Sequence, residues 1–168
     1  MNVTAALADI HNKIHDKDTI EMTTEELLIC LNEAIQYVSS YLAGTNSPAV
    51  VADITLTAEE TTLPENFVKT AGTFPVKITG NTMKWLGFTE GDTMKLRYFS
   101  TFEEVDETDE MPFKHDALNQ ITIKLAAIYA GNQLEAEISQ DKALLDEVNA
   151  LLAQAAGNGI AQAGGGAT

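Results

Sequence analysis

Two histidines, His11 and His15, are the side chains whose type and spacing first point to chemistry. They stand four residues apart on a predicted helix, and at that spacing two imidazoles can bind one metal ion. The glutamate that lies between the histidines of the zinc protease motif is missing, and the nearby Asp9 and Asp16 are typical of a solvent-facing surface. We therefore expect no metal at this pair, and we expect no cofactor elsewhere in the chain.

The single cysteine, Cys30, and three scattered carboxylates are the remaining candidates for catalysis. Cys30 falls inside a predicted helix, with no histidine close in sequence and no glycine-rich turn to present its thiol, so a core position is the better interpretation. Asp53, Asp92 and Asp116 are the candidates for carboxylate chemistry. Because the chain also lacks the glycine motifs of nucleotide binding and the nucleophile elbow, we expect that it is not an enzyme.

Residues 103–110, EEVDETDE, contain six acids and no base. Clustered carboxylates attract calcium, but this segment lacks the alternating ligands and the central glycine of an EF-hand loop. Like charges at this density favour an extended, solvated loop. The whole chain is acidic too, since 25 acids against 10 bases give a formal charge of -15, and Arg97 is its only arginine. This balance argues against nonspecific binding to DNA, which requires clustered lysine and arginine.

Aromatic residues gather in the second half of the predicted β region and offer another kind of nucleic-acid contact. They are Trp85, Phe88, Tyr98, Phe99 and Phe102. Such side chains can stack on bases, but a base-stacking platform normally lies in a positively charged groove. Because few basic residues flank this group, core packing or a subunit interface is the better interpretation.

The hydrophobic pattern predicts the helices that hold these residues. Apolar residues at helical spacing predict an N-terminal helix over residues 1–16 and a second helix over 23–43. Thr23, followed three residues later by Glu26, matches the capping box that begins a helix. Residues 115–156 return to helical spacing after the acidic segment and predict two helices in an antiparallel pair.

Between the helices, residues 49–102 are predicted to be β-rich because the hydrophobic period changes to two. Gly80-Asn81 favours a tight hairpin, residues 57–66 are predicted as a loop, and about four strands would form a small antiparallel sheet. The fold class is therefore α+β, with a bundle of about four helices packed beside an inserted antiparallel sheet. We expect a single domain over residues 1–156, followed by an extended C-terminal tail.

This tail, residues 157–168, is uncharged and rich in glycine and alanine. Each glycine costs about 1 kcal/mol relative to alanine within a helix, so the segment is predicted to be a flexible arm that needs a partner outside its own fold. The chain shows no signal sequence and no apolar run long enough for a membrane span. We expect an intracellular or virion protein that does not enter a membrane.

The elements, in their order along the chain, resemble those of the head-to-tail adaptor proteins of tailed bacteriophages, also called connector or head-completion proteins. The resemblance covers residues 23–156. It rests on the segments TTEELLICLNEAIQYVSSYL, AVVADITLT, LPENF, TMKLRYFST and DEMPFKHDALNQITIKLAAIYAGNQ. The family has a pattern of elements and no catalytic signature, and the N-terminal helix over residues 1–16 departs from its simpler members.

The resemblance implies a structural virion protein that forms a ring, commonly of twelve copies, between the capsid portal and a downstream tail or stopper protein. It would lie at the head-tail interface of the virion, and in the host cytoplasm during assembly. DNA would pass through the ring without specific binding. The implied portal-binding arm contains Gly157, Ile160, Gln162, Gly164 and Thr168. The implied channel-lining acids are Glu103, Glu104, Asp106, Glu107, Asp109 and Glu110.

The strong negative charge leaves one alternative, an acidic mimic of DNA that inhibits a nucleic-acid-binding partner. A protein with a charge of -15 can compete for a basic groove. A mimic acts as a monomer or a dimer, whereas an adaptor forms a ring. The oligomeric state therefore distinguishes the two hypotheses.

Overall fold

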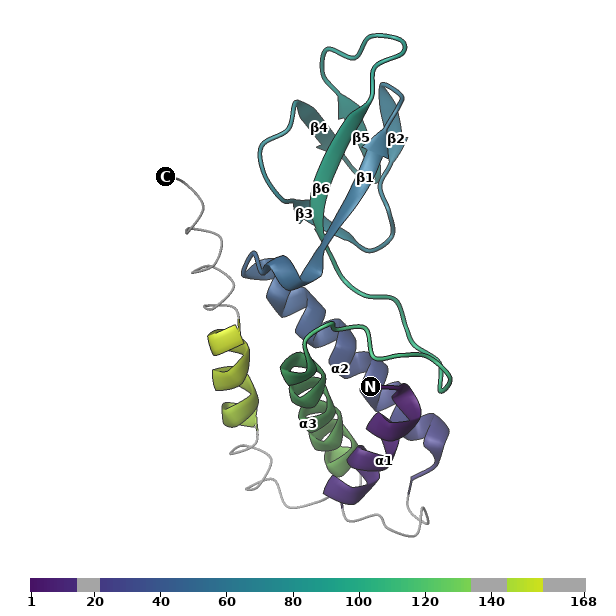
Figure 1. Cartoon of the computed structure of the whole chain (residues 1–168), viewed down its shortest axis with the longest axis vertical. Helices are drawn as coiled ribbons and strands as arrows, with labels where there is room; N and C mark the ends of the chain where they lie inside the picture. The colour runs from purple at the N-terminus through teal and green to yellow at the C-terminus, as the bar shows by residue number, and fades with distance from the viewer. Residues whose placement is uncertain (15–21, 134–144, 156–168) are drawn as a thin grey trace.

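The computed structural model describes residues 1–14, 22–133 and 145–155, and it confirms the α+β class. Helices form a body at one end of the molecule, and short strands form a separate β module at the other (Figure 1). The elements are α1 (Val3–Lys13), α2 (Thr24–Gly44), the short 3-10 helix η1 (Pro48–Val50), β1 (Val51–Leu56), β2 (Glu60–Thr62), β3 (Phe67–Thr70), β4 (Val76–Thr79), β5 (Thr82–Trp85), β6 (Met94–Ser100) and α3 (Asp116–Gln133). Residues 145–155 are also helical, and the predicted arm over 157–168 lies outside the described residues.

The first two helices begin where the sequence predicts. The side chain of Asn2 caps α1 by accepting a hydrogen bond of 2.9 Å from the N–H of Ala5. At the start of α2, the Thr23 hydroxyl accepts from the N–H of Glu26, and the Glu26 carboxylate accepts from the N–H of Thr23 at 2.7 Å. This is the predicted capping box, and it satisfies two backbone donors that the helix leaves unpaired.

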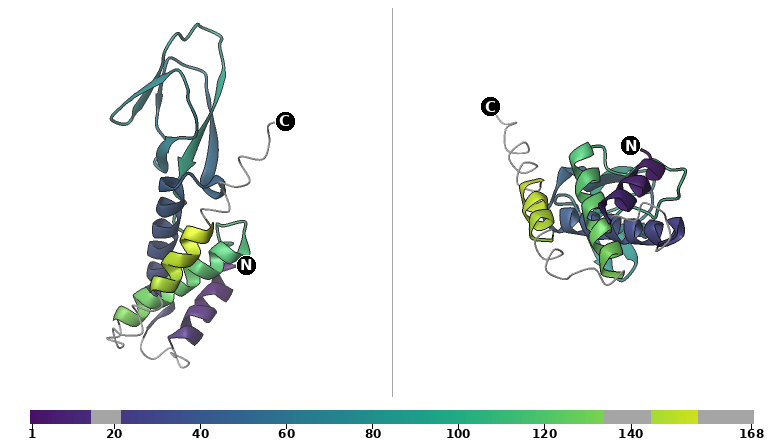
Figure 2. Two further views of the ribbon diagram at one scale, coloured as in Figure 1. Left: turned by 90° about the vertical axis from the view of Figure 1, so that its left-hand side faces the viewer. Right: turned by 90° about the horizontal axis from the view of Figure 1, so that it is seen from below.

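The centre of the helical body is α3. It packs against α1 and α2, and residues 145–155 lie along another of its sides (Figure 2). Leu125 of α3 is fully buried, as are Val148 and Leu152 of the 145–155 helix. Lys124 of α3 also forms an ion pair with Glu147. The apolar side chains of these helices therefore form one continuous core.

The β module contains two antiparallel three-stranded sheets, with the strand orders β1-β6-β3 and β2-β5-β4. A small core around Leu56, Met83 and Leu96 lies in this module. All six strands fall within the predicted β region over residues 49–102, but the single sheet of about four strands is replaced by two sheets. The loop prediction for residues 57–66 is wrong at β2.

Two strands, β2 and β3, are not predicted from the sequence, and pairing with neighbouring strands stabilises them more than their own composition does. The polar strand β2 pairs with β5, where Glu60 lies opposite Lys84 and the carboxylate of Glu59 lies 2.9 Å from the Lys84 ammonium. In β3, the pairing register shifts between Phe67 and Lys69. Such an irregularity breaks the alternation of apolar residues that identifies a strand in a sequence.

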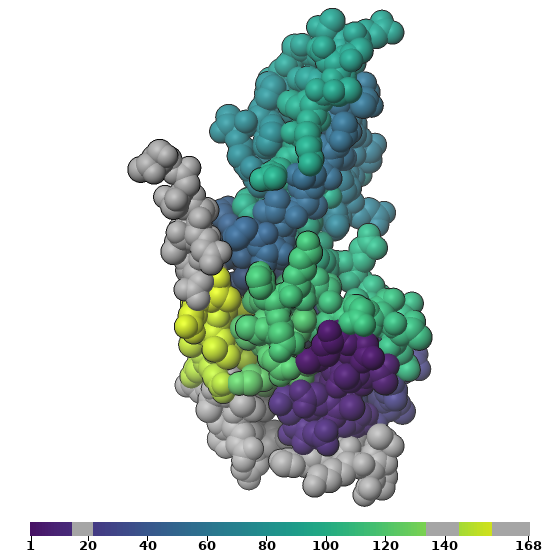
Figure 3. Space-filling model, in the orientation of Figure 1, coloured from purple at the N-terminus to yellow at the C-terminus, as the bar shows by residue number. Residues whose placement is uncertain are grey.

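The β module joins the helical body at the C-terminal end of α2 (Figure 3). There, the Lys69 ammonium donates to the carbonyl of Gly44 at 3.0 Å, and Phe99 of β6 contributes to the core of the body. The chain then leaves β6 and runs back along the body to α3 through residues 101–115, which form no helix or strand longer than an isolated bridge. This connection contains the acidic segment.

Candidate interaction surface

The acidic segment, residues 103–110, is held against α2 at its first half. The Asn32 side chain accepts a hydrogen bond from the N–H of Val105 at 2.9 Å and donates to the carbonyl of Val105 at 3.1 Å. One turn further along α2, the Gln36 amide donates to the carbonyl of Phe102. Val105 itself is buried in the body. Both backbone groups of Val105 are therefore hydrogen-bonded, as they would be in a pair of strands, although Val105 lies in no strand.

The second half of the segment is held against the N-terminus of the chain. The N–H of Val3 donates to the carbonyl of Asp109 at 2.9 Å, and the Thr4 hydroxyl donates to the carbonyl of Glu107 at 2.9 Å. The amino group of Met1 lies 3.2 Å from the Glu110 carboxylate. These contacts give the N-terminal helix a structural role, because α1 supports the far end of the acidic segment.

All six acids of the segment are solvent-exposed although its backbone is fixed. We call this feature the acidic ridge, residues 103–110. The prediction of a solvated loop is correct for its acidic side chains, but Val105 is buried and the backbone is hydrogen-bonded to both α1 and α2 at several points. Within the ridge, the Asp109 carboxylate accepts from the N–H of Asp106 at 2.8 Å, which tightens the turn between them.

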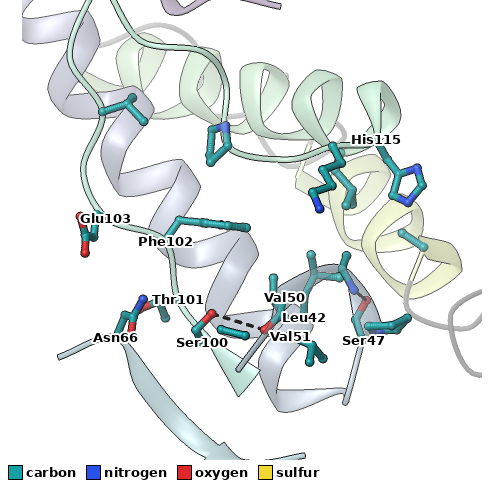
Figure 4. Close-up of a pocket in the computed structure, with 18 of the residues that line it drawn as sticks. Leu42, Ser47, Val50, Val51, Asn66, Ser100, Thr101, Phe102, Glu103 and His115 are labelled. Carbon is teal, nitrogen blue, oxygen red and sulfur yellow. Dashed lines mark hydrogen bonds between the residues drawn. The ribbon is translucent and has the colours of Figure 1, made fainter. Parts of the chain in front are cut away.

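A groove of about 960 Å³ lies beside the ridge, where the β module meets the body (Figure 4). Its floor is mainly apolar and includes Leu42, Val50 and Phe102. The Ser100 hydroxyl donates to the carbonyl of Val50 at 3.4 Å within it, and His115 lies on the side near α3. The groove has the apolar lining of a binding surface.

Among the described residues, the catalytic and metal candidates lie on separate elements. His11 lies on α1, and His15 lies outside the described residues. Asp53 forms ion pairs with Lys95 and Arg97 on β6. Within residues 1–14, 22–133 and 145–155, no group of three or more histidine, cysteine, aspartate or glutamate side chains is placed to hold a metal ion.

The other two carboxylates have local structural roles. Asp92 accepts a hydrogen bond of 3.2 Å from the N–H of Thr89 in the turn before β6, and Asp116 is the acid in the first turn of α3. Cys30 is fully buried in α2, as predicted. Burial, and after it the charge of Glu33, raises the pKa of the Cys30 thiol, which makes it a weaker nucleophile at neutral pH.

The five aromatic candidates form no common platform. Trp85 packs edge-on against Phe88 within the β module, whereas Phe102 packs edge-on against Phe113 beside the body. Tyr98 stacks on Phe67, at a distance of 5.3 Å between the ring centroids. Tyr98 and Phe99 are 6% and 8% exposed, so the core-packing interpretation holds for both.

Asn32 and Gln36, which hold the acidic segment on α2, are not among the candidate residues that the sequence indicates. Their only sequence signal is weak: both are amides on the partly buried side of an otherwise apolar helix stripe. Polar groups at such positions need hydrogen-bond partners, and here the partners are backbone groups that lie 66 and 73 residues further along the chain.

The chain matches no protein-family model. It also matches no curated protein. Among the described residues, no helix has both the length and the apolar character that crossing a membrane requires.

Proposed function

We propose that this protein is a structural component of a tailed bacteriophage that assembles as a ring, commonly of twelve copies, at the head-tail interface. The ring would join the capsid portal to a downstream tail or stopper protein and would form part of the DNA channel. DNA would pass through it without specific binding. The observation that carries this proposal is the acidic ridge, because its carboxylates are held outward on a fixed backbone.

A fixed row of carboxylates suits a channel wall for a physical reason. At physiological ionic strength, charges repel one another over only about 8 Å, so a wall must hold its acids close to the passing phosphates. A flexible acidic loop would fold back or move away, whereas the ridge cannot do so without breaking its hydrogen bonds to Asn32 and to the N-terminal residues. Repulsion at short range would keep DNA from adhering during ejection.

Neutralising the ridge tests this role. A variant with Gln at its four glutamates and Asn at its two aspartates should fold normally, since all six side chains are exposed. With the short-range repulsion removed, rings of the variant should release threaded duplex DNA more slowly at low salt than rings of the wild type do. Equal behaviour of the two rings would show that the acidic ridge does not line the channel.

The arm prediction is tested separately by deleting residues 157–168. We expect the melting temperature of the isolated protein to change by no more than about 1 °C, since the arm is predicted to add nothing to the core. Binding to the portal protein should be lost in a pull-down. The ridge variant above serves as the matched control, because it should still bind the portal. A large fall in melting temperature would show that the arm packs on its own domain.

The acidic DNA mimic remains the second candidate because the same ridge favours it. Carboxylates on a fixed backbone can imitate a row of phosphates. A mimic would inhibit a DNA-binding partner at a fixed stoichiometry without forming a ring. The protein would be titrated into a DNA-binding protein while DNA binding is measured, and the mass of the complex would be determined by light scattering. Inhibition at a fixed stoichiometry without a ring would support the mimic over the adaptor.

A further inference from the structure

The exposed side of α2 carries a regular row of acidic and apolar residues. Glu25, Ile29, Glu33 and Tyr37 follow one another at intervals of four residues, and all four are exposed. Ile29 is 52% and Tyr37 is 42% exposed, although the opposite side of this helix is buried in the core. Residues four apart lie in one line along a helix, and this line is about 18 Å long. We call these four residues the α2 row.

Single exposed apolar side chains are normal on a protein surface, but a row that alternates acid and apolar residues along one helix ridge is a surface of defined chemistry. Tyr129 of α3 borders this row. Burial, and then the nearby Tyr37 and Glu33, raise its pKa. The row is therefore continuous with the partly buried surface between α2 and α3, and it offers both carboxylates and an anchor of tyrosine and isoleucine.

The outer face of β1 and β6 has the complementary chemistry. In the register of this pair, Asp53 lies opposite Arg97 and Thr55 lies opposite Lys95. Asp53 contacts both cations, at 2.9 Å from Lys95 and 3.2 Å from Arg97. The side chains of Lys95 and Arg97 are still 67% and 66% exposed, and Val51 on the same face is 37% exposed. One carboxylate between two cations leaves this face positive.

The charge of the whole chain makes this face unusual. Residues 48–100 contain six acids and five bases, a net charge of -1, so that -14 of the total -15 falls on the rest of the chain. Nearly all the repulsion between copies therefore comes from residues outside the β module, which include the acidic ridge as well as the helices. Contact between the β module of one copy and the helical body of the next avoids that repulsion, whereas contact between two bodies does not.

We propose that the outer face of β1 and β6 in one copy docks on the α2 row of the next copy. Lys95 and Arg97 then meet Glu25 and Glu33, and Val51 packs beside Ile29 and Tyr37. The two acids lie about 12 Å apart along the helix, the two cations about 7 Å apart along the strand, and the long basic side chains span the difference. Arginine and tyrosine are the residue types enriched at interface centres.

This contact joins different surfaces of the two copies, so its repetition builds a ring when the rotation between copies closes. The inference that the contact builds a ring rests on the proposed function. A chain cannot make the whole contact with itself, because its β module is joined to the C-terminal end of α2, and Glu25 lies about 29 Å from that end. DNA is the weaker occupant of this face, since two cations that share an aspartate are a small basic patch.

Zero-length cross-linking tests the contact directly. A carbodiimide, which joins an amine to a carboxylate in contact, would be added to an equal mixture of ¹⁴N- and ¹⁵N-labelled full-length protein. We expect cross-linked peptides of mixed isotope that join Lys95 to Glu25 or Glu33. Lys95 joined only to Asp53 of its own chain would overturn the proposal.

Charge reversal supplies the quantitative test. The variants K95E/R97E and E25K/E33K should each weaken self-association by about 10-fold to 100-fold in sedimentation velocity, and one chain with all four changes should recover it. The matched control is K77E/K114E, which changes two exposed lysines outside this face, makes the same change in net charge as K95E/R97E and should associate as the wild type does. Circular dichroism would confirm that each variant folds.

Each other result has a definite meaning. If the wild type associates and K95E/R97E associates equally well, this contact is wrong and the proposed ring is unaffected. If the wild type remains a monomer both alone and with the portal, the contact and the ring are both wrong. If the face instead binds duplex DNA, and K95E/R97E abolishes that binding with no effect on self-association, it is a nucleic-acid surface and the docking proposal is overturned.

Discussion

Asn32 is the residue whose replacement tests most clearly whether the acidic ridge is fixed. Asn32→Ala removes the two hydrogen bonds to Val105, of 2.9 Å and 3.1 Å, and changes little else because the side chain is only partly buried. Each bond contributes about 1 kcal/mol, so the free energy of unfolding should fall by about 2 kcal/mol. For a domain of this size, that loss lowers the melting temperature by about 4 to 8 °C.

The measurement combines thermal unfolding with amide hydrogen exchange. The amide of Val105 should exchange about 30-fold faster in Asn32→Ala, since each 1.4 kcal/mol is a factor of ten. Gln36→Ala removes one bond and should cost about half as much. Ser40→Ala, at an exposed position of the same helix, is the control and should change stability by less than about 0.5 kcal/mol. An Asn32→Ala protein with wild-type stability and unchanged exchange at Val105 would refute the fixed ridge.

Three further predictions concern the helical body. Leu125→Ala should lower the free energy of unfolding by about 2 to 5 kcal/mol in chemical denaturation, because it opens a cavity at a fully buried position. The Thr23 N–H and hydroxyl lower the pKa of Glu26 in the folded state from 4.5, so the stability that this carboxylate adds is present above pH 4.5 and is lost as the pH falls through the lower folded value. The difference in melting temperature between wild type and Glu26→Gln should therefore shrink from pH 7 to pH 3, and a constant difference would contradict this assignment. Cys30 should not react with a thiol reagent until the protein unfolds, because it is fully buried, and rapid reaction of the native protein would disprove the packing of α2.

The elements that the sequence predicts well are those whose signals are local. The capping box at Thr23 and Glu26 marks the start of α2 in the structure, and the alternating residues of β1 and β6 form a strand pair. Gly80 has a positive φ of 57° at the predicted hairpin, and Asn81 does not, which is the sign pattern of a type II′ turn. Each of these features depends on residues within a few positions of one another.

What the sequence does not predict depends on distant partners. The polar strand β2 exists because β5 pairs with it, and β3 loses its alternation at a register shift. The acidic segment fixes its own backbone locally at the turn between Asp106 and Asp109, but its position on the body is set by Asn32 and by the N-terminus, which lie far away in sequence. The basic outer face of β1 and β6 cannot be predicted from the sequence either, because Asp53 contacts Lys95 and Arg97 only after the two strands pair.

The two parts of the chain differ strongly in charge. The β module is nearly neutral and has one positive face, whereas the rest of the chain, with the acidic ridge, carries almost all the negative charge. Surfaces of opposite character at two ends of one molecule favour contact between different faces of successive copies. The proposed contact follows from this separation of charge, and its repetition would build the proposed ring.

The central claim is that the protein assembles as a ring on a portal, and mass measurement tests it most directly. Purified full-length protein would be analysed alone and with the portal protein by size-exclusion chromatography coupled to light scattering. The adaptor proposal predicts a complex whose mass corresponds to the portal plus a full ring of adaptor copies. A small species with an unchanged mass in the presence of the portal would contradict it and would favour the acidic mimic.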